Sequence, residues 1–285
     1  MSDDLSLNND VLLTEQEREQ LQAREVRKKP NLLIFKLAGY LIPLVAVAFA
    51  VFTKNVPNGN GVHTDASPKP LHTVNIPFER ATFGMGCFWS CDSLFGAQKG
   101  VLRTRVGYSG GKSKNPSYRN IADHTEVIEI DFDPEKISYN QLLTLFWNNH
   151  EYGLTTRIKT QYQSLILYHN DKQKEIAEAS KEKEQQKRAP EQIITRIEKA
   201  GTFYPAEDYH QKYRLQHHKE LASQLKLNPQ LLQSSHVAAR LNGYLVGVGG
   251  VKQFDEEAES LGLTKQQIEY VRKYVVDNEG GGLTC

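Results

Sequence analysis

The three cysteines of the chain lie where thiol chemistry is possible. Cys87 and Cys91 flank Phe88 and Trp89 in the stretch MGCFWSC, and Cys285 is the last residue. Because Cys87 follows a glycine and is predicted in the first turn of a helix, unpaired backbone N–H groups and the helix dipole favour its thiolate. The same stretch is also compatible with an inert buried cysteine packed among aromatic core residues.

Composition excludes several classes of protein. A net charge of +1 over 285 residues supplies no overall field for steering toward nucleic acid, so no nucleic-acid partner is expected. Three cysteines are too few, and odd in number, for a disulfide scaffold, and they suit a free thiol or a redox pair. A zinc site built from Cys87, Cys91 and His124 lacks the second closely spaced ligand pair of a zinc signature, so no metal is predicted.

Interspersed strands and helices are predicted to position these residues. A strand over 79–84 leads through Gly86 into a helix that carries Phe88, Cys91 and Phe95 and that Gly100 ends. The segment 125–133 alternates apolar and polar side chains, which is typical of a half-buried strand. Ser138 and Gln141 have capping-box spacing before the next helix. Further strands are predicted over 103–108, 164–168 and 192–198, with a helix over 172–188. This order indicates an α+β fold with helices on one face of a mostly antiparallel sheet, followed from Tyr209 by a mostly helical region.

The first part of the chain has a different composition. The segment 32–52 holds one charge, Lys36, and at about 1.5 Å per residue it spans roughly 31 Å, close to the hydrocarbon thickness of a bilayer. A buried core helix is the alternative. Basic residues before the segment predict a cytoplasmic N-terminus and a C-terminal domain outside the cytoplasm or in a lumen, with a cytosolic domain as the alternative. We therefore expect a charged tail over 1–30, a single transmembrane helix over 31–53, a linker over 54–78 and one globular domain over 79–285.

Five sequence blocks occur in an order that resembles a known family. They are GCFW at 86–89, GYSGG at 107–111, HTE at 124–126, TQYQS at 160–164 and FYPAEDYHQKY at 203–213. Together they resemble the A-type peptide-methionine sulfoxide reductases, which act on the S epimer of methionine sulfoxide, over about residues 79–285. The resemblance implies a two-layer sandwich with a ferredoxin-like core and an oxidoreductase that repairs oxidised proteins without a bound cofactor.

The resemblance also implies roles for residues of these blocks. The Cys87 thiolate attacks the sulfoxide sulfur, while Phe88 and Trp89 hold the substrate methyl group. Glu126 protonates the sulfoxide oxygen, for which its carboxyl pKa must be raised by burial. Without the resemblance, Glu126 reads as an ordinary carboxylate at the end of a strand. Tyr108 and Tyr162 match tyrosines that hydrogen-bond the oxygen, and a phenol is a suitable donor in an apolar pocket.

The first step leaves a sulfenic acid on Cys87, which a second thiol must resolve. Cys285 is favoured for this role because Gly280, Gly281 and Gly282 give the tail freedom to fold back. Cys91 competes, but its place four residues after Cys87 on a helix makes a strain-free disulfide difficult. The resemblance implies that a thioredoxin-like partner then reduces the disulfide.

Three features depart from the family pattern. Ser90 and Cys91 replace the glycine and small apolar residue that usually follow GCFW, and Arg157 takes a position that is often acidic. The region from Leu215 to Asp277 is longer than in compact members and is predicted to be a helical extension. Two other functions remain open at this point: a membrane-tethered, non-catalytic module that binds oxidised or Met-rich partners, and a thiol peroxidase.

Overall fold

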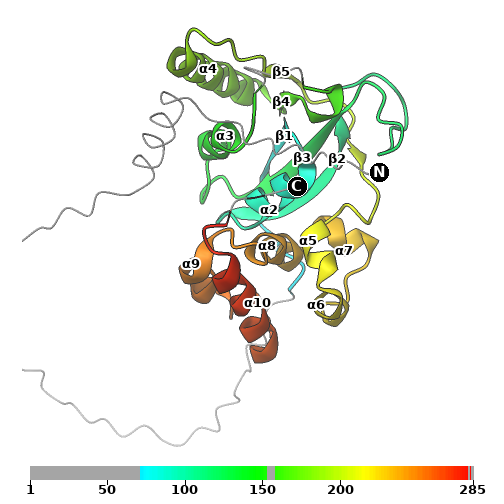
Figure 1. Ribbon diagram of the computed structural model, residues 1–285, viewed down its shortest axis with the longest axis vertical. Helices are drawn as coiled ribbons and strands as arrows, with labels where there is room; N and C mark the ends of the chain where they lie inside the picture. The colour runs from blue at the N-terminus through cyan, green and yellow to red at the C-terminus, as the bar shows by residue number, and fades with distance from the viewer. Residues whose placement is uncertain (1–70, 153–157, 282, 284–285) are drawn as a thin grey trace, which may run out of the picture. The chain divides into compact units, whose positions relative to one another are not determined.

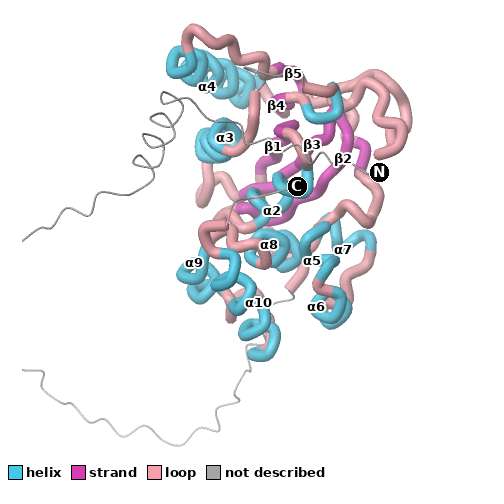
Figure 2. Tube along the Cα trace, viewed as in Figure 1, coloured by secondary structure: helices cyan, strands magenta, loops and turns pink. Residues whose placement is uncertain are grey.

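A six-stranded mixed sheet forms the centre of the molecule (Figures 1 and 2). The computed structural model describes residues 71–152, 158–281 and 283. The strands lie in the order β5-β4-β1-β3-β2-β6. Their bounds are β1 Glu79–Met85, β2 Val101–Ser109, β3 Thr125–Phe132, β4 Ser164–Tyr168, β5 Arg196–Lys199 and β6 Tyr204–Pro205. All pairs are antiparallel except β4 with β5, which are parallel.

The first four strands and two helices form a split β-α-β unit. Helix α2 (Phe88–Gly96) connects β1 to β2, and helix α3 (Tyr139–Asn148) connects β3 to β4. This β-α-β-β-α-β order, with β1 and β3 in the middle of the sheet, is the ferredoxin-like arrangement. Helix α4 (Asp171–Arg188) then leads to β5. The α+β prediction is therefore correct, and the parallel β4–β5 pair makes the sheet mixed.

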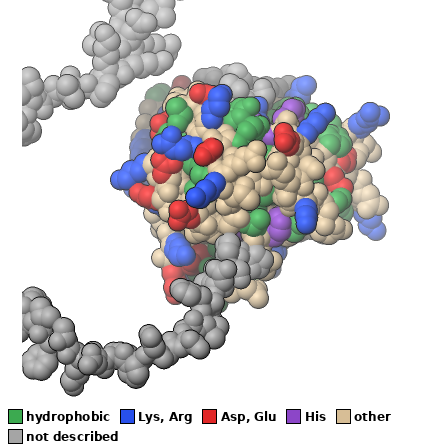
Figure 3. Space-filling model, turned by 90° about the horizontal axis from the view of Figure 1, so that it is seen from below, with side chains coloured by type: hydrophobic (Ala, Val, Ile, Leu, Met, Phe, Trp, Pro, Cys, Tyr) green, Lys and Arg blue, Asp and Glu red, His purple; other side chains and the backbone are tan. Residues whose placement is uncertain are grey.

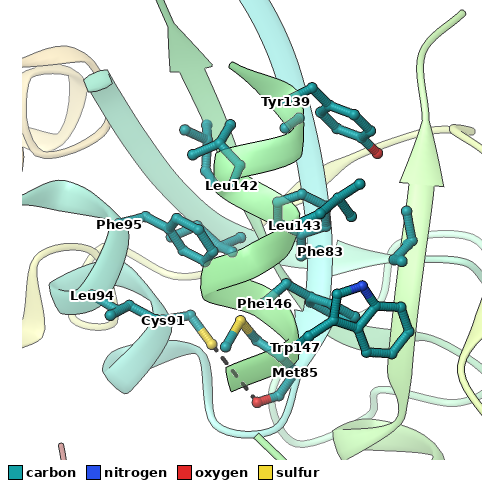
Figure 4. Packing of buried hydrophobic residues seen from close by; sticks show 14 of the residues in the cluster. Phe83, Met85, Cys91, Leu94, Phe95, Tyr139, Leu142, Leu143, Phe146 and Trp147 are labelled. Carbon is teal, nitrogen blue, oxygen red and sulfur yellow. Dashed lines mark hydrogen bonds between the residues drawn. The ribbon is translucent and has the colours of Figure 1, made fainter. Parts of the chain in front are cut away.

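One face of the sheet packs on α2, α3 and α4. Phe83 from β1 lies at the centre of this main core, with its ring centroid 5.7 Å from that of Phe95 and 5.3 Å from that of Phe146. Figure 4 shows these rings between the strands and α3, with Met85 and Cys91 at one end of the cluster. The capping box predicted for α3 is present, because Ser138 and Gln141 bond each other's backbone N–H groups. The core therefore fixes α2, and with it the start of that helix at Cys87.

The opposite face of the sheet carries a ladder of charges. Arg103 and Arg80 donate to Asp131 at 2.6 and 3.0 Å, and Arg105 pairs with Glu129. Every residue of β3 is buried, so the prediction of a half-buried strand was wrong. The polar residues alternate as expected, but arginines from β1 and β2 cover them. A single strand's pattern does not reveal which neighbouring side chains will neutralise its carboxylates.

The C-terminal region forms a second, helical core, as predicted for residues 215–277. Leu241, Tyr244, Phe254 and Val271 are among its buried members. Figure 3, seen from below, shows acidic and basic side chains interspersed over this part of the surface. The helices are α5 Tyr213–His217, α6 Lys219–Gln224, α7 Pro229–Ser234, α8 His236–Tyr244, α9 Gly250–Glu257 and α10 Lys265–Asn278.

Two glycines let helix α8 of this region approach helix α2 closely. A Cβ on Gly96 of α2 would collide with the carbonyl oxygen of Ala239 in α8. A Cβ on Gly243 of α8 would likewise collide with the carbonyl oxygen of Ser93 and the side chain of Ala97. Helices α2 and α8 therefore pack backbone to backbone.

Two predicted boundaries differ from the structure. Helix α2 ends at Gly96 rather than at Gly100, and Gly100 instead has φ +92 in the turn before β2. Strand β5 begins at Arg196, four residues after the predicted start at 192, because only residues 196–199 pair with β4. Among the described residues no helix is long and apolar enough to span a bilayer. The predicted tail over 1–30, the transmembrane helix over 31–53 and the linker as far as residue 70 lie outside the described residues.

The glycine contact between α2 and α8 predicts a specific loss of stability. Gly243→Ala should lower the free energy of unfolding by about 1–3 kcal/mol, because backbone atoms cannot yield to the added methyl group. The measurement is equilibrium urea unfolding of the full chain. Gly201→Ala is the matched control, since nothing lies within 4 Å of its added Cβ. An equal effect of the two substitutions would contradict the packing argument.

Candidate active site

Cys87 lies at the start of α2, immediately after β1. It is the N-cap residue of the helix, with φ −63 and ψ 119, and Gly86 before it has φ +87. This left-handed turn is one that glycine adopts readily. The backbone N–H of Phe88, in the first turn, donates to Oε2 of Glu126 at 3.1 Å. The cysteine and the acid are therefore joined through one peptide group.

Glu126 is a buried carboxyl group, 2% exposed, on β3. Its other oxygen, Oε1, accepts a hydrogen bond from Nε2 of Gln161 at 2.7 Å. Burial raises the pKa of Glu126 to about 7, while the hydrogen bonds from Gln161 and Phe88 act in the opposite direction. The carboxyl group is thus able to hold a proton near neutral pH, which an exposed glutamic acid does not.

The two tyrosines of the predicted site are already engaged in hydrogen bonds. The buried Tyr108 hydroxyl donates to Oε2 of Glu207 at 2.8 Å, and burial together with that carboxylate raises its pKa. Tyr162 ends the 3₁₀ turn Thr160–Tyr162. Burial raises its pKa, and the nearby Glu126 carboxylate and a hydrogen bond to Tyr118 act in the same direction. Both phenols therefore keep their protons and can serve as donors.

Glu207 accepts hydrogen bonds from the Tyr108 hydroxyl and from the backbone N–H of Tyr118. Burial acts to raise its pKa, but hydrogen bonds from its own backbone N–H, from Tyr108 and from the backbone N–H of Tyr118 lower it. The bond from the Tyr118 N–H to Oε1 is 3.1 Å long. Glu207 is thus a carboxylate that orients Tyr108, whereas Glu126 is a carboxyl group with a raised pKa.

Aromatic rings form a wall beside the cysteine. The Trp89 ring stacks on Tyr213, with centroids 3.7 Å apart and planes 2° apart, and its indole N–H donates to Nδ1 of His210 at 3.0 Å. The Phe88 ring lies 5.0 Å from the His210 ring and 6.0 Å from that of Tyr108. Burial lowers the pKa of His210, so the ring stays neutral and its Nδ1 can accept a hydrogen bond from the indole N–H. The orientation of Trp89 is therefore fixed both by stacking and by a hydrogen bond.

A buried ion pair fixes the segment that carries this wall. The Lys212 ammonium, with no exposed surface, lies 3.1 Å from Oδ1 of Asp92 on α2 and donates to the Thr104 carbonyl at 2.6 Å. The backbone N–H of Lys212 also donates to Asp92 at 3.0 Å. Lys212 has φ +50, a conformation that costs a non-glycine residue energy. The pair therefore holds residues around 212 against the helix that Cys87 begins.

Cys91 is a free thiol that points into the main core. Its Sγ donates to the carbonyl oxygen of Cys87 at 3.2 Å, and it is 2% exposed. Figure 4 shows its sulfur directed toward Met85, with a dashed line to the Met85 carbonyl oxygen. Burial raises its pKa, and the Glu126 and Asp92 carboxylates add to that effect. Cys91 is therefore held as a neutral, shielded thiol.

A cavity of about 480 Å³ lies beside Cys87, and Phe88 and Trp89 are not among its lining residues. Leu283 and Gly281 of the C-terminal tail line it together with Cys87. Cys285 and Arg157 lie outside the described residues. The other lining residues are Met85, Ser90, Cys91, Leu94, Asn149, His150, Glu151 and Val248.

The structure thus brings together Cys87, Phe88, Trp89, Tyr108 and Glu126, with Tyr162 close enough for the Glu126 carboxylate to affect its pKa. Sequence reasoning missed Gln161, Tyr118, Glu207, His210 and Tyr213. Four of these lie in the TQYQS and FYPAEDYHQKY blocks. Those blocks carried the family resemblance, but it assigned no role to these four residues. Tyr118 lies in a loop and carried no signal.

Comparisons with known proteins show which family the sequence matches. The family model of peptide methionine sulfoxide reductase matches residues 79–240, and that of the helical domain of selenoprotein methionine sulfoxide reductase A matches residues 226–276. A peptide methionine sulfoxide reductase of Drosophila melanogaster is 62% identical over 216 residues, which are 76% of this chain and 88% of that protein. Peptide methionine sulfoxide reductase A5 of Oryza sativa subsp. japonica is 35% identical, over 73% of this chain and 84% of its own length. The solved structure of methionine sulfoxide reductase A of Corynebacterium diphtheriae is 30% identical, covers 52% of this chain and 82% of its own, and has a TM-score of 0.45.

The fold and the site define an α+β protein in which a cysteine at the start of a helix lies beside a buried acid. The matches identify it more closely: the chain belongs to the peptide methionine sulfoxide reductase family. It is an oxidoreductase that reduces methionine sulfoxide.

The environment of Glu126 predicts how its titration responds to one substitution. In the native chain its side-chain carboxyl carbon should titrate near pH 7 in a carbon-13 NMR experiment. Gln161→Leu removes a hydrogen bond that favours the carboxylate, so the pKa of Glu126 should rise further. Gln224→Leu, whose amide lies far from the site on α6, serves as the control. A pKa that falls in Gln161→Leu would contradict this assignment.

Proposed function

We propose that the enzyme reduces the S epimer of methionine sulfoxide, in proteins and as the free amino acid, with Cys87 as the nucleophile and Glu126 as the general acid. The observation that carries the proposal is the carboxyl group of Glu126, which is 2% exposed, has a pKa raised to about 7, and is hydrogen-bonded to the peptide N–H that follows Cys87. An acid with a pKa near the working pH is best suited to donate a proton in a transition state.

In the first step the Cys87 thiolate attacks the sulfoxide sulfur, and Glu126 gives its proton to the sulfoxide oxygen. The S–O bond then breaks, and the oxygen is transferred to Cys87. Methionine leaves, and Cys87 carries a sulfenic acid. The sulfoxide is reduced by two electrons and the cysteine is oxidised by two, so the step needs no cofactor.

The aromatic wall and the tyrosines select and orient the substrate. Phe88 and Trp89 provide the apolar surface for the substrate methyl group, and Tyr213 with His210 keeps the indole in place. Tyr108 and Tyr162 supply phenol donors for the sulfoxide oxygen. Tyr108 would exchange its bond to Glu207 for the substrate, since one hydroxyl proton serves one acceptor at a time.

We assign resolution of the sulfenic acid to Cys285. Its thiol attacks the Cys87 sulfur, an S–S bond forms, the S–OH bond breaks, and the hydroxide leaves as water with the thiol proton. Leu283, two residues earlier, lines the cavity beside Cys87, which supports this assignment. Cys91 is less suited because burial raises its pKa and its thiol donates to a backbone carbonyl. A thioredoxin-like protein is the proposed reductant of the disulfide.

We also propose that residues 31–53 anchor the enzyme in a membrane, with the N-terminus in the cytoplasm and the catalytic domain outside it or in a lumen. The support is the length and apolarity of the segment and the basic residues before it. A catalytic domain facing the cytosol is the alternative orientation.

Cysteine variants of the full chain test the chemistry. With dithiothreitol, Cys87→Ser should lose all measurable turnover of methionine S-sulfoxide. Without reductant, the native chain should form one equivalent of methionine and fall from three free thiols to one, because two of its 3 cysteines join. Cys285→Ser should still form that equivalent but keep a sulfenic acid that a cyclic 1,3-dione traps. Cys91→Ser is the control and should match the native chain.

Two results would contradict the proposal. Methionine formation by Cys87→Ser would show that Cys87 is not the nucleophile. Disulfide formation by Cys285→Ser would show that Cys91 is the resolving thiol. Comparison of hydrogen peroxide with the sulfoxide as oxidant separates the reductase from a thiol peroxidase. Turnover of the R epimer at the same rate would overturn the proposed stereospecificity.

The anchor is tested by fractionation and by topology. The full chain should remain with membranes after an alkaline wash, and replacement of residues 31–53 by a Gly/Ser linker should release it with its activity retained. A glycosylation acceptor placed within residues 55–70 should be modified in secretory membranes. Release of the native chain by the wash would disprove the anchor, whereas an unmodified acceptor would favour the cytosolic orientation.

A further inference from the structure

His210 has a buried ring nitrogen that makes no hydrogen bond. Its Nδ1 accepts from the Trp89 indole N–H at 3.0 Å. Because an indole nitrogen only donates, the neutral imidazole carries its own proton on the other nitrogen, Nε2. His210 is 1% exposed, and its Nε2 has no hydrogen-bond partner in the part of the chain that the structure describes. The Nε2–H group is therefore a buried donor whose bond is not made here.

Three aromatic rings hold the imidazole in this orientation. The ring centroids of Tyr209, Tyr118 and Phe88 lie 4.1, 4.6 and 5.0 Å from that of His210. A turn of the imidazole would also break the hydrogen bond from the Trp89 indole. A buried donor without a partner costs free energy, so we expect its acceptor to arrive in another state of the enzyme.

The Glu207 carboxylate lies just beyond hydrogen-bond distance of this donor. Its Oε2 is 3.9 Å from Nε2 of His210, and the same oxygen accepts from the Tyr108 hydroxyl at 2.8 Å. The other oxygen, Oε1, accepts from the backbone N–H of Tyr118 at 3.1 Å. Oε2 thus lies between a donor that it binds and a donor that it does not reach. An approach of about 1 Å would bring the second donor to ordinary hydrogen-bond distance.

We propose that His210 is a positioning residue for sulfoxide reduction: when the Tyr108 hydroxyl turns to the sulfoxide oxygen, the Glu207 carboxylate accepts the Nε2–H of His210 in its place. This inference rests on the proposed function, in which Tyr108 leaves Glu207 for the substrate. No covalent bond changes and no proton is transferred between residues, since one hydrogen bond replaces another.

The replacement lowers the cost of releasing Tyr108 from Glu207. Without it, Oε2 would lose a hydrogen bond each time the hydroxyl turned to the substrate. With it, Oε2 regains a bond and the unpaired donor of His210 gains its first. The gain exists only when the sulfoxide oxygen engages Tyr108, so it favours the reacting complex over the free enzyme and should raise kcat/KM.

Proton and nitrogen-15 NMR of the full chain test the hydrogen-bond exchange directly. Tyr108→Phe removes the competing hydroxyl, so the Nε2 proton of His210 should move downfield without any sulfoxide, because the freed carboxylate accepts it. In Cys87→Ser, methionine S-sulfoxide should cause the same downfield shift on binding. Glu207→Leu removes the acceptor and should abolish both shifts. The resonance is assigned by its absence from His210→Asn.

A double-mutant cycle tests the consequence for turnover. Asparagine at position 210 keeps an oxygen that can accept from the indole but has no donor at the place of Nε2. His210→Asn should lower kcat/KM for methionine S-sulfoxide about tenfold. In a Glu207→Leu background the same change should lower it less than twofold, because the partner is already absent. His218→Asn is the matched control and should leave kcat/KM unchanged, since that histidine bonds the Tyr270 hydroxyl in the helical region.

The outcomes separate this inference from the proposed function. An unshifted Nε2 proton in Tyr108→Phe would overturn the role of His210. A tenfold loss on His210→Asn that persists in Glu207→Leu would overturn it as well, because His210 would then act through another group. A native chain that forms no methionine from the S-sulfoxide contradicts the proposed function, and the role of His210 fails with it, whereas full turnover with an unshifted proton contradicts the role of His210 alone.

Discussion

The ion pair between Asp92 and Lys212 is the interaction on which the rest of the site depends. It lies without solvent exposure between α2 and the segment before α5, and it draws in Thr104 of β2 through two further hydrogen bonds. Removal of one partner of such a pair typically costs about 3–5 kcal/mol, because the remaining charge is buried without compensation. Here the pair joins three elements that are far apart in sequence. Its position on α2 also couples it directly to the helix that Cys87 begins.

The consequences of this pair extend along the segment from Glu207 to Tyr213. Each of three side chains in that segment contacts a different part of the site: Glu207 bonds Tyr108, His210 accepts from Trp89, and Tyr213 stacks on the same indole. A segment with little regular structure of its own is therefore held in place by a buried charge at one end. Rigid placement of aromatic rings and hydroxyl donors matters because catalysis requires reacting groups to be oriented in advance.

The site uses burial to give two glutamic acids different roles. Glu126 has few compensating donors, so burial dominates and its pKa rises to about 7. Glu207 receives hydrogen bonds from Tyr108 and from two backbone N–H groups, and its pKa falls. Two carboxyl groups near Tyr108 thus differ in protonation at neutral pH, one suited to give a proton and the other to orient a phenol. Burial also keeps the free thiol of Cys91 neutral inside the core, because it raises the pKa of that thiol.

The sequence by itself determined the elements and the order of the chemistry-bearing blocks. Turn glycines, the Ser138 capping box and alternating strands are local signals, and five ordered motifs carried the family resemblance and the candidate residues Cys87, Glu126, Tyr108 and Tyr162. Tertiary structure alone decided what surrounds them. The burial of both faces of β3 depends on arginines from neighbouring strands. Burial raises the pKa of Glu126, and a hydrogen bond from Gln161, 35 residues away, acts in the opposite direction. The contacts of Tyr118 and His210 likewise join distant segments. Local patterns record backbone preferences and periodicity, whereas desolvation and side-chain partners exist only once the chain has folded.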